Sequence, residues 1–147
     1  MVKRKLHPKF FFTPEERGRI VEAIRNAEAQ TSGEIRVHLE RRSRGEIMNH
    51  ARKIFERLGM TKTKRQNGIL IYLSLADHAF AIFGDQGIHE QVGDQFWNEV
   101  ARKIQDAFSK HEFAEGLVAG IAEIGERLKA YFPYETGDRN ELSDKIS

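Results

Sequence analysis

The feature that most constrains the fold is an almost unbroken apolar run, GILIYLSL, over residues 68–75. The run has the length of a β-strand, and its lack of alternation is typical of a strand that is covered on both faces. Such a strand needs a layer above it and a layer below it, which helices supply in α/β proteins. The run therefore predicts the central strand of a layered α/β domain.

The segments on either side of this run predict its neighbours in the sheet. Residues 34–40 alternate strictly between polar and apolar side chains, which predicts a strand with one buried face. Between the two strands lies an amphipathic helix that carries Ile54 and Phe55 on its apolar face and ends at Gly59. Strand, helix and strand in this order predict a parallel pair with a right-handed crossover. A third apolar run, at residues 79–83, predicts a hairpin partner.

Three further helices are expected around this sheet. Thr13, Pro14 and Glu16 form a capped helix start, and this helix is expected to run to about Gln30. Two more helices are predicted by regularly spaced apolar residues, which are Val92, Phe96, Val100, Ile104 and Phe108 in one and Phe113, Leu117, Ile121, Ile124 and Leu128 in the other. The expected fold is a three-layer α/β/α sandwich with a small mixed sheet and helices on both faces. Residues 9–12 are a candidate for a fourth strand at an edge.

The length of 147 residues fits one domain, which we expect over residues 13–132. A basic segment, 1–12, precedes it, and a polar tail, 133–147, is expected to be flexible. The basic start lacks the apolar stretch of a signal peptide, and no segment approaches the roughly 18 apolar residues of a membrane span. These observations predict a cytoplasmic protein. The chain has no cysteine, which excludes a disulfide scaffold and a thiol nucleophile.

A net charge of +2 hides a strong division along the chain. Residues 1–73 carry 17 Lys or Arg and 8 Asp or Glu, whereas residues 74–147 carry 7 and 14. Such asymmetry marks a basic surface for an acidic partner, unless the two halves intermix their charges in the folded domain. Aromatic side chains accompany the basic segments only at Phe10 to Phe12, so we do not expect a nucleic acid as the partner.

Several local signatures, in their order and spacing, resemble the TPM domain family over roughly residues 15–132. They are SGEI at residues 32–35, NGIL at residues 67–70, Gly84 with Gly87 and Ile88 after the third strand, and the helix pair from Gly93 to Tyr131. The resemblance implies an α/β/α sandwich. It also implies weak acid phosphatase activity and calcium binding, which are linked to plant relatives of the thylakoid lumen. Bacterial members are often found near LemA-type membrane proteins, which the resemblance raises as partners.

One edge of the predicted sheet is a candidate metal site. Two parallel strands begin there and the third strand ends there, which gathers Glu34, Asn67 and Asp85. Their side-chain oxygens, with backbone carbonyls, suit a hard cation such as Ca²⁺ or Mg²⁺. The residue before Asn67 is frequently Asp in the family and is Gln66 here, which argues against carrying the family's metal site over.

The opposite edge holds the carboxyl ends of the parallel strands, where ligands usually bind in open α/β sheets. The segment RRSR at residues 41–44 suits a phosphate, and Asp77 or His78 in the hairpin turn suits acid–base chemistry. Asp77 and Asp85 are therefore the candidate catalytic residues, one at each edge, and the sequence does not choose between the edges.

Other motifs of catalysis are missing from the sequence. The six histidines show no paired spacing such as H-x-x-x-H, and neither a phosphate-binding loop nor a G-x-S-x-G elbow occurs. The leading hypothesis is therefore a non-catalytic interaction or accessory module that binds a protein partner in a membrane-associated complex. The alternatives are a weak divalent-metal-dependent acid phosphatase and a calcium-binding domain without catalysis.

Overall fold

A mixed sheet of three strands lies at the centre of the computed structural model, which describes residues 4–135 and 146–147. The strands are β1 (Glu34–Glu40), β2 (Gly68–Ser74) and β3 (Ala79–Gly84), in the order β1-β2-β3. β1 and β2 are parallel, and β3 is antiparallel to β2. All seven residues of β2 are buried, as the unbroken apolar run predicted.

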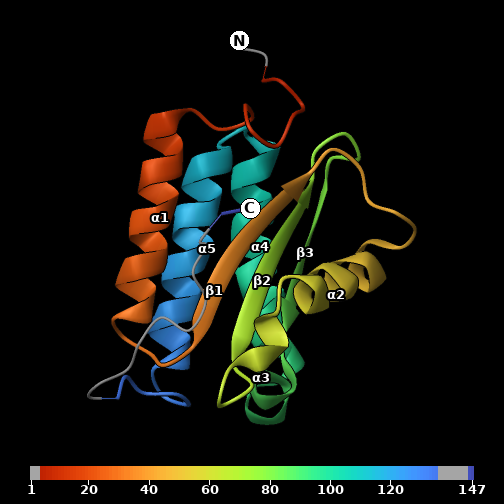
Figure 1. The fold of residues 1–147 in the computed structure, drawn as a ribbon. Coiled ribbons are helices and arrows are strands. Elements are labelled where there is room, and N and C mark those ends of the chain that lie inside the picture. Colours follow the sequence, from red (N-terminus) through yellow and green to blue (C-terminus); the bar gives the residue numbers. More distant parts are fainter. Residues whose placement is uncertain (1–3, 136–145) are drawn as a thin grey trace.

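Helices cover both faces of the sheet (Figure 1). One face carries α1 (Pro14–Glu28), α4 (Asp94–Ser109) and α5 (Phe113–Leu128), and the other carries α2 (Ile47–Arg57) with a short 3₁₀ turn, η1 (Met60–Lys62). The predicted three-layer α/β/α sandwich is therefore confirmed. Its layers are unequal, because three long helices lie on one side and a single one on the other.

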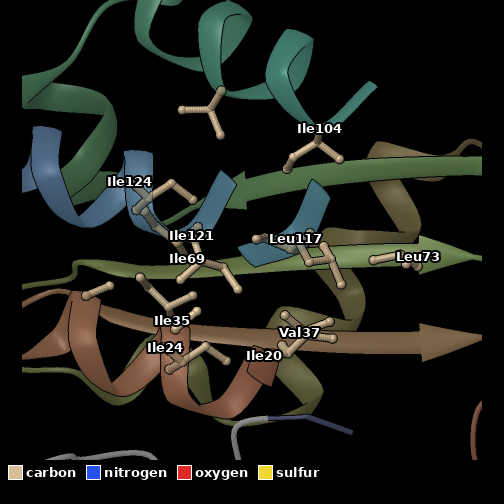
Figure 2. Packing of buried hydrophobic residues seen from close by; sticks show 14 of the residues in the cluster. Ile20, Ile24, Ile35, Val37, Ile69, Leu73, Ile104, Leu117, Ile121 and Ile124 are labelled. Carbon is tan, nitrogen blue, oxygen red and sulfur yellow. The ribbon is translucent and has the colours of Figure 1, made fainter. Parts of the chain in front are cut away.

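Each face of the sheet has its own hydrophobic core. The main core lies between the sheet and the three-helix layer, and Figure 2 shows Ile20 and Ile24 of α1, Ile35 and Val37 of β1, and Ile121 and Ile124 of α5 packing there. A smaller core lies under α2 and consists of Ala51, Ile54, Phe55, Met60, Leu70, Tyr72 and Ala81. β2 contributes to both cores through alternate residues, which explains why its sequence shows no polar face.

The helix boundaries follow the sequence with one exception. Thr13 caps α1 through the predicted box with Glu16. The exception is a short helix that the sequence did not predict, α3 (Gln86–Gln91), which separates β3 from α4. Val92 was expected in the long helix but lies between α3 and α4, where it is still buried. The sequence predicted a turn here, because Asp85 and Gly87 are common turn residues. In the structure Asp85 instead caps the start of α3.

The proposed fourth strand at residues 9–12 is wrong. This segment turns on itself, because the backbone N–H groups of Phe10 and Phe11 both donate to the carbonyl of His7. Phe11 and Phe12 are buried in the main core, which anchors the segment through side chains rather than through a strand ladder. Arg4 supports the anchor, since its guanidinium lies 2.6 Å from the Glu16 carboxylate and 5.3 Å from the centre of the Phe11 ring.

The predicted flexible tail falls mostly outside the described residues, which exclude 136–145. Two described positions in the tail pair with the body of the domain. Pro133 forms an isolated antiparallel bridge with Thr31, and Ile146 forms a parallel bridge with Val37 of β1. The domain boundaries at residues 13 and 132 remain predictions.

Candidate functional site

The amino ends of β1 and β2 and the carboxyl end of β3 bring the three predicted metal-binding residues to one edge of the sheet. Glu34 lies opposite Gly68 in the parallel register, and its N–H donates to the carbonyl of Asn67 over 3.2 Å. The N–H of Asp85 donates to the carbonyl of Gly68 over 2.9 Å. The three backbones therefore lie side by side.

The side chains at this edge are largely withdrawn from solvent. Glu34 is 3% exposed and Asn67 is 1% exposed. The amide Nδ2 of Asn67 donates to Ser32 Oγ over 3.2 Å. Asp85 Oδ1 accepts the N–H of Gln86 over 2.8 Å, whereas its Oδ2 is buried without a hydrogen-bond partner among the described residues. Buried polar atoms are nearly always hydrogen-bonded, so this oxygen calls for an explanation.

Backbone carbonyls approach the same edge from the loop before β2. A Cβ added to Gly87 would lie 2.6 Å from the carbonyl oxygen of Gln66, so the loop packs directly on the first turn of α3. Any side chain at residue 87 would force the two apart. Among the described residues, no group of three His, Cys, Asp or Glu side chains is placed to hold a metal ion. A cation here would rely on two carboxylates, an amide and backbone carbonyls, an all-oxygen set that suits Ca²⁺ or Mg²⁺ rather than zinc.

The opposite edge contains a partly buried polar network that was not predicted from the sequence. Glu40 Oε1 accepts the Tyr72 hydroxyl over 2.8 Å and lies 2.7 Å from His50 Nε2. Glu40 Oε2 lies 3.3 Å from His38 Nε2, and the other ring nitrogen of His38 lies 2.7 Å from Ser147 Oγ. One carboxylate thus joins β1, β2 and α2 and, through His38, Ser147.

Burial and hydrogen bonding shift the pKa values of three groups in this network, Glu40, His38 and Tyr72. Burial raises the pKa of Glu40, but contacts with His50, Tyr72 and His38 outweigh burial and hold it below its ordinary value. Burial lowers the pKa of His38. Burial, together with the hydrogen bond to Glu40, raises the pKa of the Tyr72 hydroxyl. The network therefore combines an ionised carboxylate with a neutral phenol.

Asp77 also lies at this edge, where it ties the loop after β1 to the hairpin turn. Its Oδ2 accepts the Ser74 hydroxyl over 2.5 Å and the N–H of Ser43 over 3.0 Å, and Arg42 lies 3.6 Å from Oδ1. The Ser74 hydroxyl, followed by the Ser43 N–H, lowers the pKa of Asp77. His78 occupies the turn with a φ of 53°.

The two candidate catalytic residues lie at opposite ends of the sheet. Asp77 precedes β3 and Asp85 follows it, and a strand of six residues spans about 20 Å. The structure therefore divides Asp77 and Asp85 between two sites. β1 did carry one sign of this network, because its polar residues lie on the face that α2 covers. In the structure these residues are buried or half-buried. The alternation of β1 alone predicted that its polar face would be exposed to solvent.

Residues 8–127 match the TPM domain family, and the chain belongs to this family. It is similar in structure to the BA42 protein of the psychrophilic bacterium Bizionia argentinensis, with 47% identity, a TM-score of 0.89, and coverage of 93% of this chain and 94% of that one.

Two more distant structures share the fold alone. The N-terminal domain of the cg2496 protein of Corynebacterium glutamicum has a TM-score of 0.63 at 13% identity, with 92% of this chain and 80% of that one covered. An N-terminal domain from P. gingivalis has a TM-score of 0.65 at 19% identity, with coverage of 82% and 78%. No curated protein matches the chain. None of the helices in the described part of the chain combines the length and apolar character needed to span a membrane.

Proposed function

We propose that this TPM domain is an accessory module that binds an acidic protein partner through the layer formed by α2 and its flanking loops. The observation that carries the proposal is the charge of residues 41–65, which include nine Lys or Arg and only two Glu. All nine basic residues are exposed. The division of charge along the sequence thus corresponds to a basic layer on one side of the sheet.

The basic side chains of this layer are mostly available to a partner. Seven of the nine form no ion pair with a described residue, namely Arg41, Arg44, Arg52, Lys53, Arg57, Lys62 and Lys64. In the three-helix layer, by contrast, basic residues pair with acidic neighbours, as Lys103 and Arg127 both do with Glu123. An unneutralised basic surface speeds association with an acidic partner and selects against basic ones. A membrane-associated complex with a LemA-type protein is the setting that the family suggests.

A charge reversal on α2 tests this role. We expect Arg52→Glu with Lys53→Glu to reduce partner capture from detergent-solubilised native cells by at least about tenfold, because the steering charge is inverted. Capture by the unchanged protein should also weaken in high salt, which screens exposed charges. The readout is quantitative mass spectrometry of the captured proteins.

The matched control is Arg102→Glu with Lys110→Glu, which changes the net charge equally on the exposed surface of α4 and the turn that follows it. This variant should capture the same partner as the unchanged protein. Equal capture by both double variants, or no partner that depends on the α2 charges, would contradict the role of the basic layer.

A second candidate function is divalent cation binding at the edge formed by Glu34, Asn67 and Asp85. The buried Asp85 Oδ2 supports it, since a cation would give this oxygen the partner it lacks among the described residues. The presence of Gln66 does not by itself argue against such a site. This residue has a φ of 51°, and left-handed backbone favours Asn and Asp, so the acidic residue common there in the family has a conformational reason as well.

Thermal melts with and without metal test the cation site. We expect millimolar Ca²⁺ or Mg²⁺ to raise the melting temperature, because a ligand at one hundred times its Kd adds about 2.7 kcal/mol to the free energy of unfolding. Asp85→Asn should abolish this rise, and Asn preserves the helix cap that Asp85 supplies to α3.

Asp77→Asn, at the opposite edge, is the control and should keep the full metal response. A melt of the unchanged protein that does not respond to either cation would remove the site. If the bound cation also supports phosphate-ester hydrolysis, the turnover rate must rise with added metal and fall to zero in Asp85→Asn. A turnover rate that depends neither on added metal nor on this substitution indicates a contaminating enzyme.

A further inference from the structure

We propose that residues 4–12, the docking turn, attach this domain to an anionic lipid surface, with Phe10 entering the boundary between headgroups and acyl chains. Phe10 is 62% exposed, the largest value among the large apolar side chains that the structure describes. A single exposed apolar residue is common at protein surfaces and needs no special explanation. Phe10 stands apart because of the turn that carries it and the charges beside it.

The docking turn holds Phe10 away from the core by anchoring its two neighbours. Phe11 and Phe12 are 6% and 2% exposed, and the Phe11 ring lies 5.2 Å from the ring of Phe113 at the start of α5. The backbone N–H groups of Phe10 and Phe11 both donate to the carbonyl of His7. An aromatic ring thus projects from a turn that is fixed by backbone hydrogen bonds and by two buried side chains.

Two lysines accompany this ring, and the docking turn contains no Asp or Glu. Arg4 is paired with Glu16. Lys5 and Lys9 are exposed and form no ion pair with any residue that the structure describes. Lys5 Nζ lies 5.7 Å from the centre of the Phe10 ring, so a cation and an apolar ring share one side of the turn. This combination complements an anionic surface with an apolar interior.

The docking turn lies at one end of the domain, beside the turn between α4 and α5 (Figure 1). A single projecting ring suits a partner that yields to it, as a bilayer does without a matching pocket. The ring enters below the headgroups, while the lysine ammonium groups stay among the phosphates. Each lysine strengthens binding to an anionic leaflet by about fivefold, so one ring and two lysines give weak and reversible binding.

This surface shares no residue with the basic layer on α2 or with the cation site, so neither of those proposals is needed for it. Co-sedimentation of the full chain with lipid vesicles tests it. We expect binding to vesicles of phosphatidylcholine mixed with phosphatidylglycerol, half-complete at lipid concentrations on the order of millimolar. Binding to vesicles of phosphatidylcholine alone should be much weaker, because the lysines then have no anionic headgroups to meet.

Two variants assign the binding to the docking turn. Phe10→Ser should weaken binding to the mixed vesicles by at least about fivefold, because it removes the apolar ring. Lys5→Glu with Lys9→Glu should weaken it by at least about tenfold, because the charge is inverted. In NMR spectra, a spin-labelled lipid should broaden the amide signals of Lys9 and Phe10 before those of α2.

Matched controls separate the docking turn from general effects of charge and apolar surface. Tyr131→Ser removes a ring that is 46% exposed just after the end of α5. Arg25→Glu with Arg102→Glu makes the same change of net charge at exposed positions of α1 and α4. Both variants should bind the mixed vesicles as the unchanged protein does.

Three results would overturn the proposal. The first is equal binding by Phe10→Ser and the unchanged protein, or no vesicle binding at all. The second is binding that is lost in Arg52→Glu with Lys53→Glu but kept in Lys5→Glu with Lys9→Glu, because anionic lipid would then contact the basic layer on α2. The third is a loss of protein capture in Phe10→Ser without a loss of vesicle binding, because the turn would then serve a protein.

Discussion

Gly125→Ala is expected to lower the free energy of unfolding by about 1–3 kcal/mol, the usual cost of overpacking a close helix contact. The added Cβ would lie 2.7 Å from the Cβ and 2.8 Å from the Cα of Ala27, on the facing helix α1. Because one of these atoms belongs to the backbone, no rotation of a side chain can relieve the clash, and α1 and α5 must separate. Urea denaturation at fixed pH measures the effect as a lower midpoint.

Gly18→Ala is the matched control for this prediction. Gly18 lies inside α1, and no atom lies within 4 Å of an added Cβ there. The same substitution should therefore raise the free energy of unfolding by about 0.5–1 kcal/mol, since alanine restricts the unfolded chain and favours the helix. Opposite signs at the two glycines are the expected result, and a loss of equal size at both would show that the close contact between α1 and α5 is not responsible.

Glu40→Ala is the second substitution for which we expect a large effect. Its carboxylate accepts the Tyr72 hydroxyl and contacts His50, and these two residues are 0% and 4% exposed. Removing the acceptor leaves buried polar groups without a partner, at a cost of about 1–3 kcal/mol for each group. The measurement is again the free energy of unfolding at neutral pH. Tyr72→Phe should cost less, because it removes a donor while Glu40 keeps its contacts with both histidines.

The pH dependence of Glu40→Gln separates the electrostatic contribution of Glu40 from its contribution to packing. The pKa of Glu40 in the folded state lies below its ordinary value of 4.5. Its ionised form therefore stabilises the fold fully above that value, and the contribution is lost as the pH falls through the folded pKa. The stability difference between the unchanged protein and Glu40→Gln should shrink in acid, and a difference that stays constant from neutral pH to below pH 4 would exclude this role.

The parts of the fold that follow from local patterns were predictable. The bounds of β1 coincide with the alternating segment, because alternation shows directly which face of the strand each side chain occupies. The short helix α3 was not predictable in the same way, since its six residues are too few to show a helical period and its start resembles a turn. The segment at residues 9–12 misled because three consecutive phenylalanines suit a strand as well as a buried turn.

The candidate sites show the same division between local and long-range information. Strand directions alone place Glu34, Asn67 and Asp85 at one edge, so this grouping was accessible from the sequence. The network around Glu40 was not, because it depends on the pairing of His38 with Tyr72 across two strands and on how α2 packs on the sheet. No spacing within one segment reports those contacts. Polar residues on a face that α2 covers were the one available sign.

The contact between α1 and α5 also has a consequence for the order of events during synthesis. Arg19 and Glu115, which form an ion pair between these helices, are 96 residues apart in the chain. α1 leaves the ribosome before the sheet and the other helices of this domain, but its apolar face lacks its partner α5 until nearly a hundred more residues have followed. The nascent chain must therefore carry this amphipathic helix without its helical partner while the sheet and the other helices of the domain are made, and α1 can pack on α5 only after α5 has been synthesised.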